Sequence, residues 1–213
     1  MEPETAHISP ERALATHPVE SVLADGARRG GARQAWLDAG LHLLTLEGAP
    51  ALTIERLCAA TGRTRGSFYH HFAGVDAFAG ALLQHWRETC TEDLISIVDR
   101  LDDAWERRVA LDRLAVGLNG ALERAVRRWS ATDRQAESVL KAVDARRLTY
   151  LADTIQRVTG GDDSEAADLA RIEYAACIGF DALFRDMAVS ELERLVAMVS
   201  MLTTPRRNES EEE

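Results

Sequence analysis

Apolar residues recur at helical spacing along most of the chain. Ala32, Trp36, Ala39, Leu43 and Leu46 step by four and three, which predicts one buried face on a helix over residues 32–47. Strand-like alternation persists nowhere, so the pattern predicts an all-α protein. The further helices are expected at about residues 54–60, 65–71, 75–104, 107–129, 134–159, 165–188 and 190–203.

Two short helices joined by a tight turn are predicted around Gly62. Thr53 and Thr64 are the expected N-caps, because a threonine hydroxyl can accept a backbone N–H at the start of a helix. Gly62 can adopt the left-handed conformation that ends the first helix. Phe68 and Phe72, four residues apart, are expected in the core, which leaves the start of the second helix slender and polar. A helix-turn-helix needs this arrangement to place its second helix in the DNA major groove.

The sequence around this turn resembles the DNA-binding domain of the tetracycline-repressor (TetR) family of bacterial regulators, over roughly residues 28–80. The resemblance rests on a combination of residues, namely Thr53-Ile54, Leu57, Gly62 and Thr64-Arg65-Gly66-Ser67-Phe68-Tyr69-His70-His71-Phe72. It implies a three-helix, helix-turn-helix DNA-binding domain followed by a helical domain for ligand binding and dimerisation. It also implies a homodimer that a small-molecule effector releases from a double-stranded DNA operator.

Two features depart from the family pattern. Arg63 stands where the family usually has a small apolar residue, so its aliphatic stem is expected to extend out of the turn. Ala73, Gly74 and Val75 stand where the family usually has lysines. The missing phosphate contact predicts modest operator affinity, and it keeps open an alternative function as a ligand-binding or scaffolding dimer without operator binding.

The resemblance and the helical pattern divide the chain into four segments. They are a mobile acidic arm at 1–27, the DNA-binding domain at 28–74, the ligand-binding and dimerisation domain at 75–204, and a disordered tail at 205–213. The formal net charge is −10, yet residues 28–72 hold six arginines and three acidic residues. Phosphate binding depends on local positive charge, so an acidic remainder is compatible with a DNA-binding protein.

The residues expected to contact DNA lie around the predicted turn. Arg65 is placed to bond guanine edges or phosphate, and Tyr69 matches a phosphate-contacting tyrosine of the resembling family. Arg28 and Arg29, with Arg33, either grip the flanking backbone or form a solvated basic arm. The full set comprises Arg33, Thr53, Arg63, Thr64, Arg65, Gly66, Ser67, Tyr69 and His70.

Large aromatic residues in the C-terminal segment are candidates for the ligand pocket that the resemblance implies. Aromatics at helical spacing are also typical of a core, so simple packing is the alternative for each of them. The candidates are Trp86, Trp105, Trp129, Tyr150, Tyr174, Phe180 and Phe184.

The last two predicted helices carry apolar stripes that step by three and four. Such stripes can pair as half of an intermolecular four-helix bundle or pack within one subunit, and the resemblance favours the dimer. The stripes consist of Leu169, Ile172, Ala176, Gly179 and Leu183, and of Leu192, Leu195, Val199 and Leu202.

Catalysis and metal binding are not indicated. His70 and His71 point about 100° apart on a helix and make a poor chelate. The chain lacks Gly-x-Ser-x-Gly, a phosphate-binding glycine loop and His-Glu-x-x-His, so no enzyme activity, cofactor or metal is expected. Three widely spaced cysteines, the lack of a signal-peptide layout and the lack of a long apolar run predict a cytoplasmic protein without a membrane partner.

Overall fold

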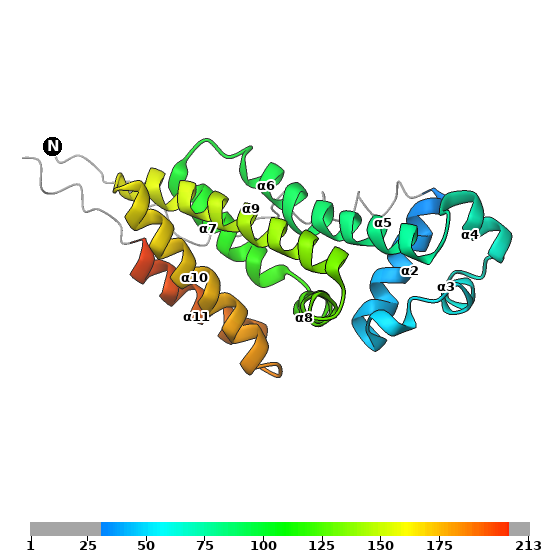
Figure 1. Ribbon diagram of the computed structural model, residues 1–213. Coiled ribbons are helices and arrows are strands. Elements are labelled where there is room, and N and C mark those ends of the chain that lie inside the picture. The colour runs from blue at the N-terminus through cyan, green and yellow to red at the C-terminus, as the bar shows by residue number, and fades with distance from the viewer. Residues whose placement is uncertain (1–30, 205–213) are drawn as a thin grey trace, which may run out of the picture.

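The computed structural model describes residues 31–204, which form α-helices and no strand (Figure 1). The all-α fold class is therefore confirmed. The predicted arm and tail, together with Arg28 and Arg29, lie outside the described residues. The elements are α2 (Ala32–Glu47), the 3₁₀ turn η2 (Ala49–Ala51), α3 (Ile54–Thr61), α4 (Arg65–His71), α5 (Val75–Arg87), the π-helical turn η3 (Glu88–Glu92), α6 (Asp93–Val98), α7 (Ala104–Gly117), α8 (Gly120–Ser130), α9 (Arg134–Thr159), α10 (Asp163–Leu183) and α11 (Val189–Thr203).

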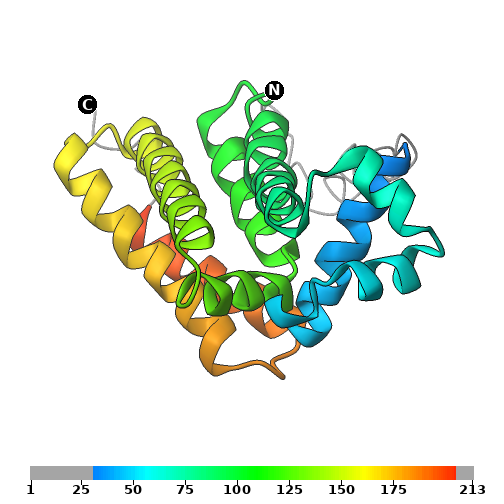
Figure 2. The same cartoon turned by 45° about the vertical axis from the view of Figure 1, so that its right-hand side comes forward.

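The helices α2, α3 and α4 form one end of the molecule, and α10 with α11 lie toward the other (Figure 1). Between them, α5 packs against α9, α10 covers α9, and α11 packs on α7 and α10. Figure 2 shows α8 lying across the base of the longer helices, where it contacts both α2 and α9. The helix α8 therefore joins the helix-turn-helix end to the rest of the bundle.

The core of the helix-turn-helix end is aromatic. Trp36 and Phe68 are fully buried, and their rings meet edge to face with centroids 5.5 Å apart. Gly40 allows α5 to approach α2 closely, because a Cβ at this position would lie 2.6 Å from the ring of Phe78. The same buried cluster continues through α5 into α8, where it includes Trp129. The boundary placed between residues 74 and 75 therefore crosses a continuous core.

Two predicted helices are interrupted in the structure. The helix expected at 75–104 contains the π-helical turn η3 and ends at Val98, and the carboxylate of Asp103 accepts the Glu106 N–H at 2.8 Å to start α7. The helix expected at 107–129 is split because Asn119 caps α8 by accepting the Leu122 N–H at 3.2 Å. Both predictions were wrong because capping residues lie inside an otherwise helical apolar pattern.

The remaining boundaries differ little from the expected ones. The helix α9 spans the expected residues 134–159 and ends at Gly160, whose φ of 62° is left-handed. The helix α10 starts two residues earlier than expected and ends at Leu183 rather than 188. Leu46, expected on the buried face of α2, is 66% exposed because the core ends at Leu43 and Leu44.

The turn between α3 and α4 gives a stability prediction. Gly62 has a φ of 65°, a conformation that strains any residue with a Cβ, so Gly62→Ala is expected to lower the free energy of unfolding by about 1 kcal/mol. Gly66 lies within α4, and a Cβ there would meet its nearest atom at 3.8 Å, an ordinary contact distance. Because alanine favours a helix more than glycine does, Gly66→Ala is expected to raise the free energy of unfolding by about 0.5–1 kcal/mol. Urea unfolding of both variants measures the two signs, and a Gly62→Ala protein as stable as the parent would contradict the account of the turn.

Candidate DNA-binding surface and ligand cavity

The helix-turn-helix is held by its caps and by a buried anchor. Thr53 Oγ1 accepts the Arg56 N–H and Thr64 Oγ1 accepts the Ser67 N–H, each at 3.3 Å. Phe68, on the opposite side of α4 from solvent, is fully buried. The capping roles and the inward position of Phe68 are confirmed, and they fix the orientation of a helix of seven residues.

Most of the residues predicted to contact DNA are exposed. Tyr69 is 56% exposed, although its ring also makes an edge-to-face contact with Phe68 at a centroid distance of 5.7 Å. Thr53 and Ser67 are partly exposed, and Arg33 lies over the ring of Phe72 at 5.4 Å. The other exposed members of the set are Arg63, Thr64, Arg65, Gly66 and His70. The predicted residues thus lie in the turn and α4, except Arg33 on α2 and Thr53 at the start of α3.

Two arginines of this end pair with carboxylates at the surface. Arg65 forms an ion pair with Glu55 of α3, and Arg56 forms one with Glu47 of α2. Both pairs are largely exposed, so each contributes little to stability. Arg65 can therefore exchange Glu55 for a phosphate or a guanine edge at small cost.

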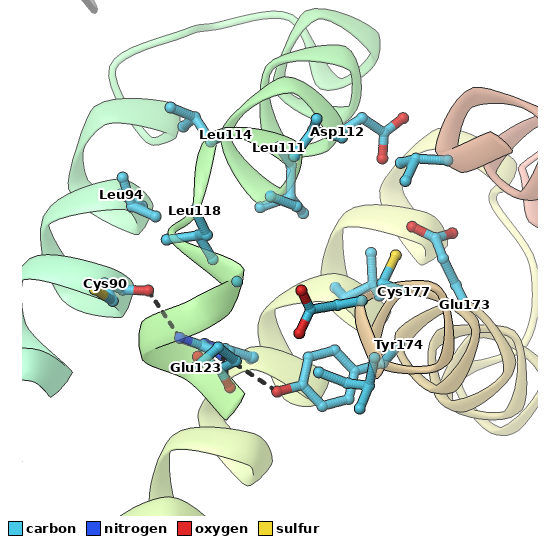
Figure 3. A pocket seen from close by; sticks show the side chains of 18 of the residues that line it. Cys90, Leu94, Leu111, Asp112, Leu114, Leu118, Glu123, Glu173, Tyr174 and Cys177 are labelled. Carbon is cyan, nitrogen blue, oxygen red and sulfur yellow. Dashed lines mark hydrogen bonds and ion pairs between the residues drawn. The ribbon is translucent and has the colours of Figure 1, made fainter. Parts of the chain in front are cut away.

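A cavity of about 300 Å³ is enclosed by residues of η3, α6, α7, α8, α9, α10 and α11. Figure 3 shows Leu94, Leu111, Leu114 and Leu118 on its apolar side, and Asp112 with Glu173 at another part of the wall. Tyr174 and Cys177 project from α10 toward the same space. A largely apolar hollow with a few polar groups suits a small organic ligand.

The structure places the seven candidate aromatics in different surroundings. Tyr150 and Tyr174 line the cavity. Trp86 and Trp129 belong to the buried core that joins α2 to α8, with 1% and 8% of their surface exposed. Trp105 lines a smaller recess between α7 and α11. Phe180 is partly buried and Phe184 is 51% exposed, and neither lines the cavity.

Sequence reasoning missed the charged residues of the cavity wall. They are Asp112, Glu123, Arg147, Glu173 and Asp181. Each lies on a helix beside ordinary solvated charges, so no local pattern distinguishes it. They meet because α7, α8, α9 and α10 pack around one space.

Arg147 of α9 connects three parts of the wall. Its Nη2 donates to the Cys90 carbonyl oxygen at 3.0 Å, and its Nε donates to Thr91 Oγ1 at 3.0 Å, both within the π-helical turn η3. Its Nη1 donates to Glu123 Oε1 of α8 at 3.1 Å, and the guanidinium lies 5.6 Å from the ring centre of Trp86. Arg147 therefore holds η3 and α8 in a fixed relation to α9.

Arg108 carries a second buried network. The Arg108 side chain is fully buried, and its Nη2 lies 2.6 Å from both carboxylate oxygens of Glu173. Its Nη1 donates to Asp112 Oδ1 at 2.5 Å, and Thr203 Oγ1 donates to Glu173 Oε2 at 2.6 Å. Burial raises the pKa of the Glu173 and Asp112 carboxyls, although Arg108 acts in the opposite direction. One guanidinium thus serves two carboxylates.

The thiols on the wall are not activated. Burial raises the pKa of Cys90 and raises that of Cys177 to about 12. Both are therefore protonated at neutral pH and are poor nucleophiles.

The stripes predicted for dimerisation are partly exposed. Ile172, Leu183 and Leu202 are 60%, 75% and 79% exposed, and Met198 and Met201 of α11 are also exposed. The other members, Leu169, Ala176, Gly179, Leu192, Leu195 and Val199, are partly buried, and Leu192 lines the cavity. The helices α10 and α11 therefore present large apolar side chains to solvent in the single chain.

Residues 31–204 hold neither a membrane-spanning helix nor a cluster of metal ligands. From residue 31 to residue 204, no helix has the length and apolar character that crossing a membrane requires. Histidine, cysteine and carboxylate side chains do not gather in groups of three that could hold a metal ion within this range.

The Arg108 network gives a pH prediction. Because burial raises the pKa of Asp112 and Glu173, the folded protein keeps their protons at pH values where the unfolded chain has released them. The free energy of unfolding should fall as the pH rises from about 4, the ordinary carboxyl pKa, through the raised values. Asp112→Asn removes one of these groups and should make the fall smaller.

Urea unfolding of the parent and of Asp112→Asn between pH 4 and 8 measures this difference. Asp168→Asn serves as the control, because Asp168 is 69% exposed on α10 and pairs with Arg171 at the surface. Parallel pH profiles for the parent and Asp112→Asn would contradict the assigned role of burial.

Comparisons with known proteins agree with this geometry. Residues 37–82 match the family model of bacterial regulatory proteins, tetR family. A TetR-family transcriptional regulator from Streptomyces coelicolor has a similar structure, with a TM-score of 0.70 and 19% identity, over 89% of this chain and 96% of that one. The reduced form of NemR from E. coli gives a TM-score of 0.67 and 18% identity, over 79% of this chain and 96% of that one.

A candidate transcriptional regulator from Saccharomonospora viridis, solved in complex with choline, is also similar. Its TM-score is 0.66 with 19% identity, over 78% of this chain and 94% of that one. At such identities the structural likeness shows the fold. No curated protein sequence matches this chain significantly.

Proposed function

Because the chain belongs to the TetR family of bacterial regulatory proteins, we propose that it is a homodimeric repressor that leaves its DNA operator when a small molecule binds. The observation that carries the proposal is the exposed helix α4, capped by Thr64 and anchored by Phe68, with Arg65 and Tyr69 toward solvent. A protein with this role acts in the cytoplasm, where the DNA is. No catalytic role is proposed.

The helix α4 is suited to the major groove because it is slender at its start. Gly66 has no side chain, so the backbone can approach the base edges. Arg65 would read a guanine or hold a phosphate, while Tyr69 would donate to a phosphate. The lysines missing after Phe72 reduce the number of phosphate contacts, so the affinity should depend less on salt than that of a lysine-rich relative.

A second copy of the chain is the proposed cover for α10 and α11. Large exposed side chains such as Ile172, Leu183 and Leu202 lose unfavourable contact with water when two chains pair. Pairing also presents two copies of α4 to one DNA face. Half-sites about 34 Å apart, one helical turn, then form a palindromic operator.

The proposed signal runs from the cavity wall to α2. The wall includes η3 and α8, and both α5 and α8 pack against α2. Gln34 of α2 also lies 2.8 Å from the ring nitrogen of His85 on α5. A ligand that favours a different placement of η3 and α8 would tilt the helix-turn-helix end. The ligand can lower operator affinity by no more than the factor by which it binds this arrangement more tightly than the DNA-binding one.

The alternative is a ligand-binding or scaffolding dimer without operator binding. Two features favour this alternative: Ala73, Gly74 and Val75 stand where the resembling family usually has lysines, and Arg65 is paired with Glu55. A salt titration of binding to DNA from near the protein's own gene, against random DNA, separates the two functions. Selective retention near physiological salt supports the repressor, and equally weak binding to both DNAs supports the alternative.

Arg65 and Glu55 give a paired prediction. Arg65→Ala should weaken operator binding by about 1–3 kcal/mol and relax preference at one base pair in each half-site. Glu55→Gln frees the guanidinium from its ion pair and should strengthen binding by up to about 1 kcal/mol. Gel-shift titrations with one operator measure both changes, and unchanged affinity in Arg65→Ala would remove this residue from the interface.

The dimer surface gives a second prediction. Leu202→Glu would bury a carboxylate at the proposed interface and should weaken the dimer by about 2 kcal/mol or more. Leu46→Glu is the matched control, since Leu46 is a 66% exposed leucine on α2. Sedimentation equilibrium should show dissociation for Leu202→Glu alone, and equal behaviour of the two variants would place the interface elsewhere.

A further inference from the structure

The charged groups that face the cavity are predominantly acidic. Four carboxylates line it, and Arg147 is the one arginine or lysine among the described lining residues. The arginines that pair with the other carboxylates, such as Arg108 and Arg124, lie behind the wall and do not line it. A ligand in the cavity therefore meets carboxylate oxygens before it meets their counterions. The four carboxylates are Asp112, Glu123, Glu173 and Asp181.

The negative charge is uncompensated at one part of the wall. Asp181 has Arg124 as its partner, while Glu123 pairs with Arg127 and Arg147, and Arg127 also pairs with Asp144. In both groups acids and arginines are equal in number. By contrast, Asp112 and Glu173 share Arg108, and no other ion-pair partner of either carboxylate occurs within residues 31–204. When both are ionised, this group carries one net negative charge.

The protein itself does little to stabilise that charge. The side chain of Glu173 is 4% exposed and that of Asp112 is 18% exposed, so water compensates little of it. The raised pKa of both carboxyls is the expected response to this environment. A cationic group beside them would supply the missing positive charge.

We propose that the cavity binds monovalent organic cations with an apolar body, such as substituted amines or quaternary ammonium compounds, and that Asp112 and Glu173 receive the charged group. The leucines of α6 and α7 contact the apolar body, and Tyr150 and Tyr174 add aromatic rings to the wall, which attract a cation more than an anion. This inference names the effector class of the proposed repressor, and it rests on that function only for the consequence at DNA.

Other ligand classes fit the wall less well. A neutral apolar molecule would leave the net negative charge of Asp112 and Glu173 without compensation and would displace the little water that reaches them, which costs free energy. An anion would meet repulsion from the carboxylates. Arg147, the cation on the wall, already donates to Cys90, Thr91 and Glu123 and would have to break these bonds to receive it.

The test compares three probes of similar size on the full chain. Benzyltrimethylammonium is the cation, neopentylbenzene has the same shape without charge, and 3-phenylpropionate is an anion. Tryptophan fluorescence titration and thermal unfolding, in one common cosolvent, measure binding. The cation should bind at least about tenfold more tightly than the neutral isostere, and the anion most weakly.

Variants then locate the charged group. Asp112→Asn and Glu173→Gln each remove the net negative charge while keeping the side-chain shape, and each should reduce cation affinity at least about tenfold without changing that of the neutral probe. Asp168→Asn, on the exposed side of α10, should change neither. If Glu173→Gln fails to fold, Asp112→Asn and the probe comparison on the parent protein carry the test.

Three results would overturn the inference: a neutral or anionic probe that binds as tightly as the cation, no binding of any probe, or cation binding that Asp112→Asn leaves unchanged. The salt titration on DNA is read separately. Cation binding without selective DNA binding would retain the inference and reject the repressor. An operator complex that an anion releases would retain the repressor and reject the inference.

Discussion

Phe68 is fully buried on a helix of only seven residues, and the position of that helix depends on the aromatic contacts it makes. A helix this short is not stable alone, so its orientation comes from packing against Trp36 and Phe78 and from the cap at Thr64. The same buried cluster extends through α5 to α8. The helices that carry the surface proposed to read DNA therefore pack in one continuous core with α5 and α8. In the proposed mechanism this packing transmits a change at the cavity wall to α4.

Charge divides the molecule into parts with different tasks. Around α4 the exposed arginines are held loosely by surface carboxylates, which a DNA phosphate can replace at small cost. At the cavity Arg108 is fully buried and paired with Asp112 and Glu173, and this pairing is costly to disturb. The chain is acidic overall, and part of this negative charge lies in the cavity wall, where it favours a positively charged ligand. The acidic net charge does not prevent local attraction of the arginines around α4 to DNA.

Local signals in the sequence were sufficient for the helix-turn-helix and for several helices. The caps at Thr53 and Thr64, the left-handed Gly62 and the limits of α2 and α9 all follow from residue types and spacing within one turn. The breaks at Asp103 and Asn119 were missed because a short polar residue within an apolar period is compatible with both a cap and an exposed helical position.

The cavity depends on tertiary packing and was less predictable. Large aromatics were the natural candidates, yet Trp86 and Trp129 fill the core between α2 and α8, where their size stabilises the junction. The polar residues of the wall, such as Arg147 and Glu173, are ordinary in sequence and become distinctive only because distant helices bring them together. Arg147 and Glu123 are 24 residues apart in the sequence, and Arg108 and Glu173 are 65 residues apart. No periodic sequence pattern extends over such separations.

The central claim is that two copies of α4 read DNA together. Selection of bound sequences from random double-stranded DNA by the full chain tests this most directly, because it reports specificity, symmetry and spacing at once. The account predicts an enriched inverted repeat whose half-sites lie about one helical turn, or a multiple of it, apart. A pool without any enriched sequence at low salt, or a single half-site without symmetry, would contradict it.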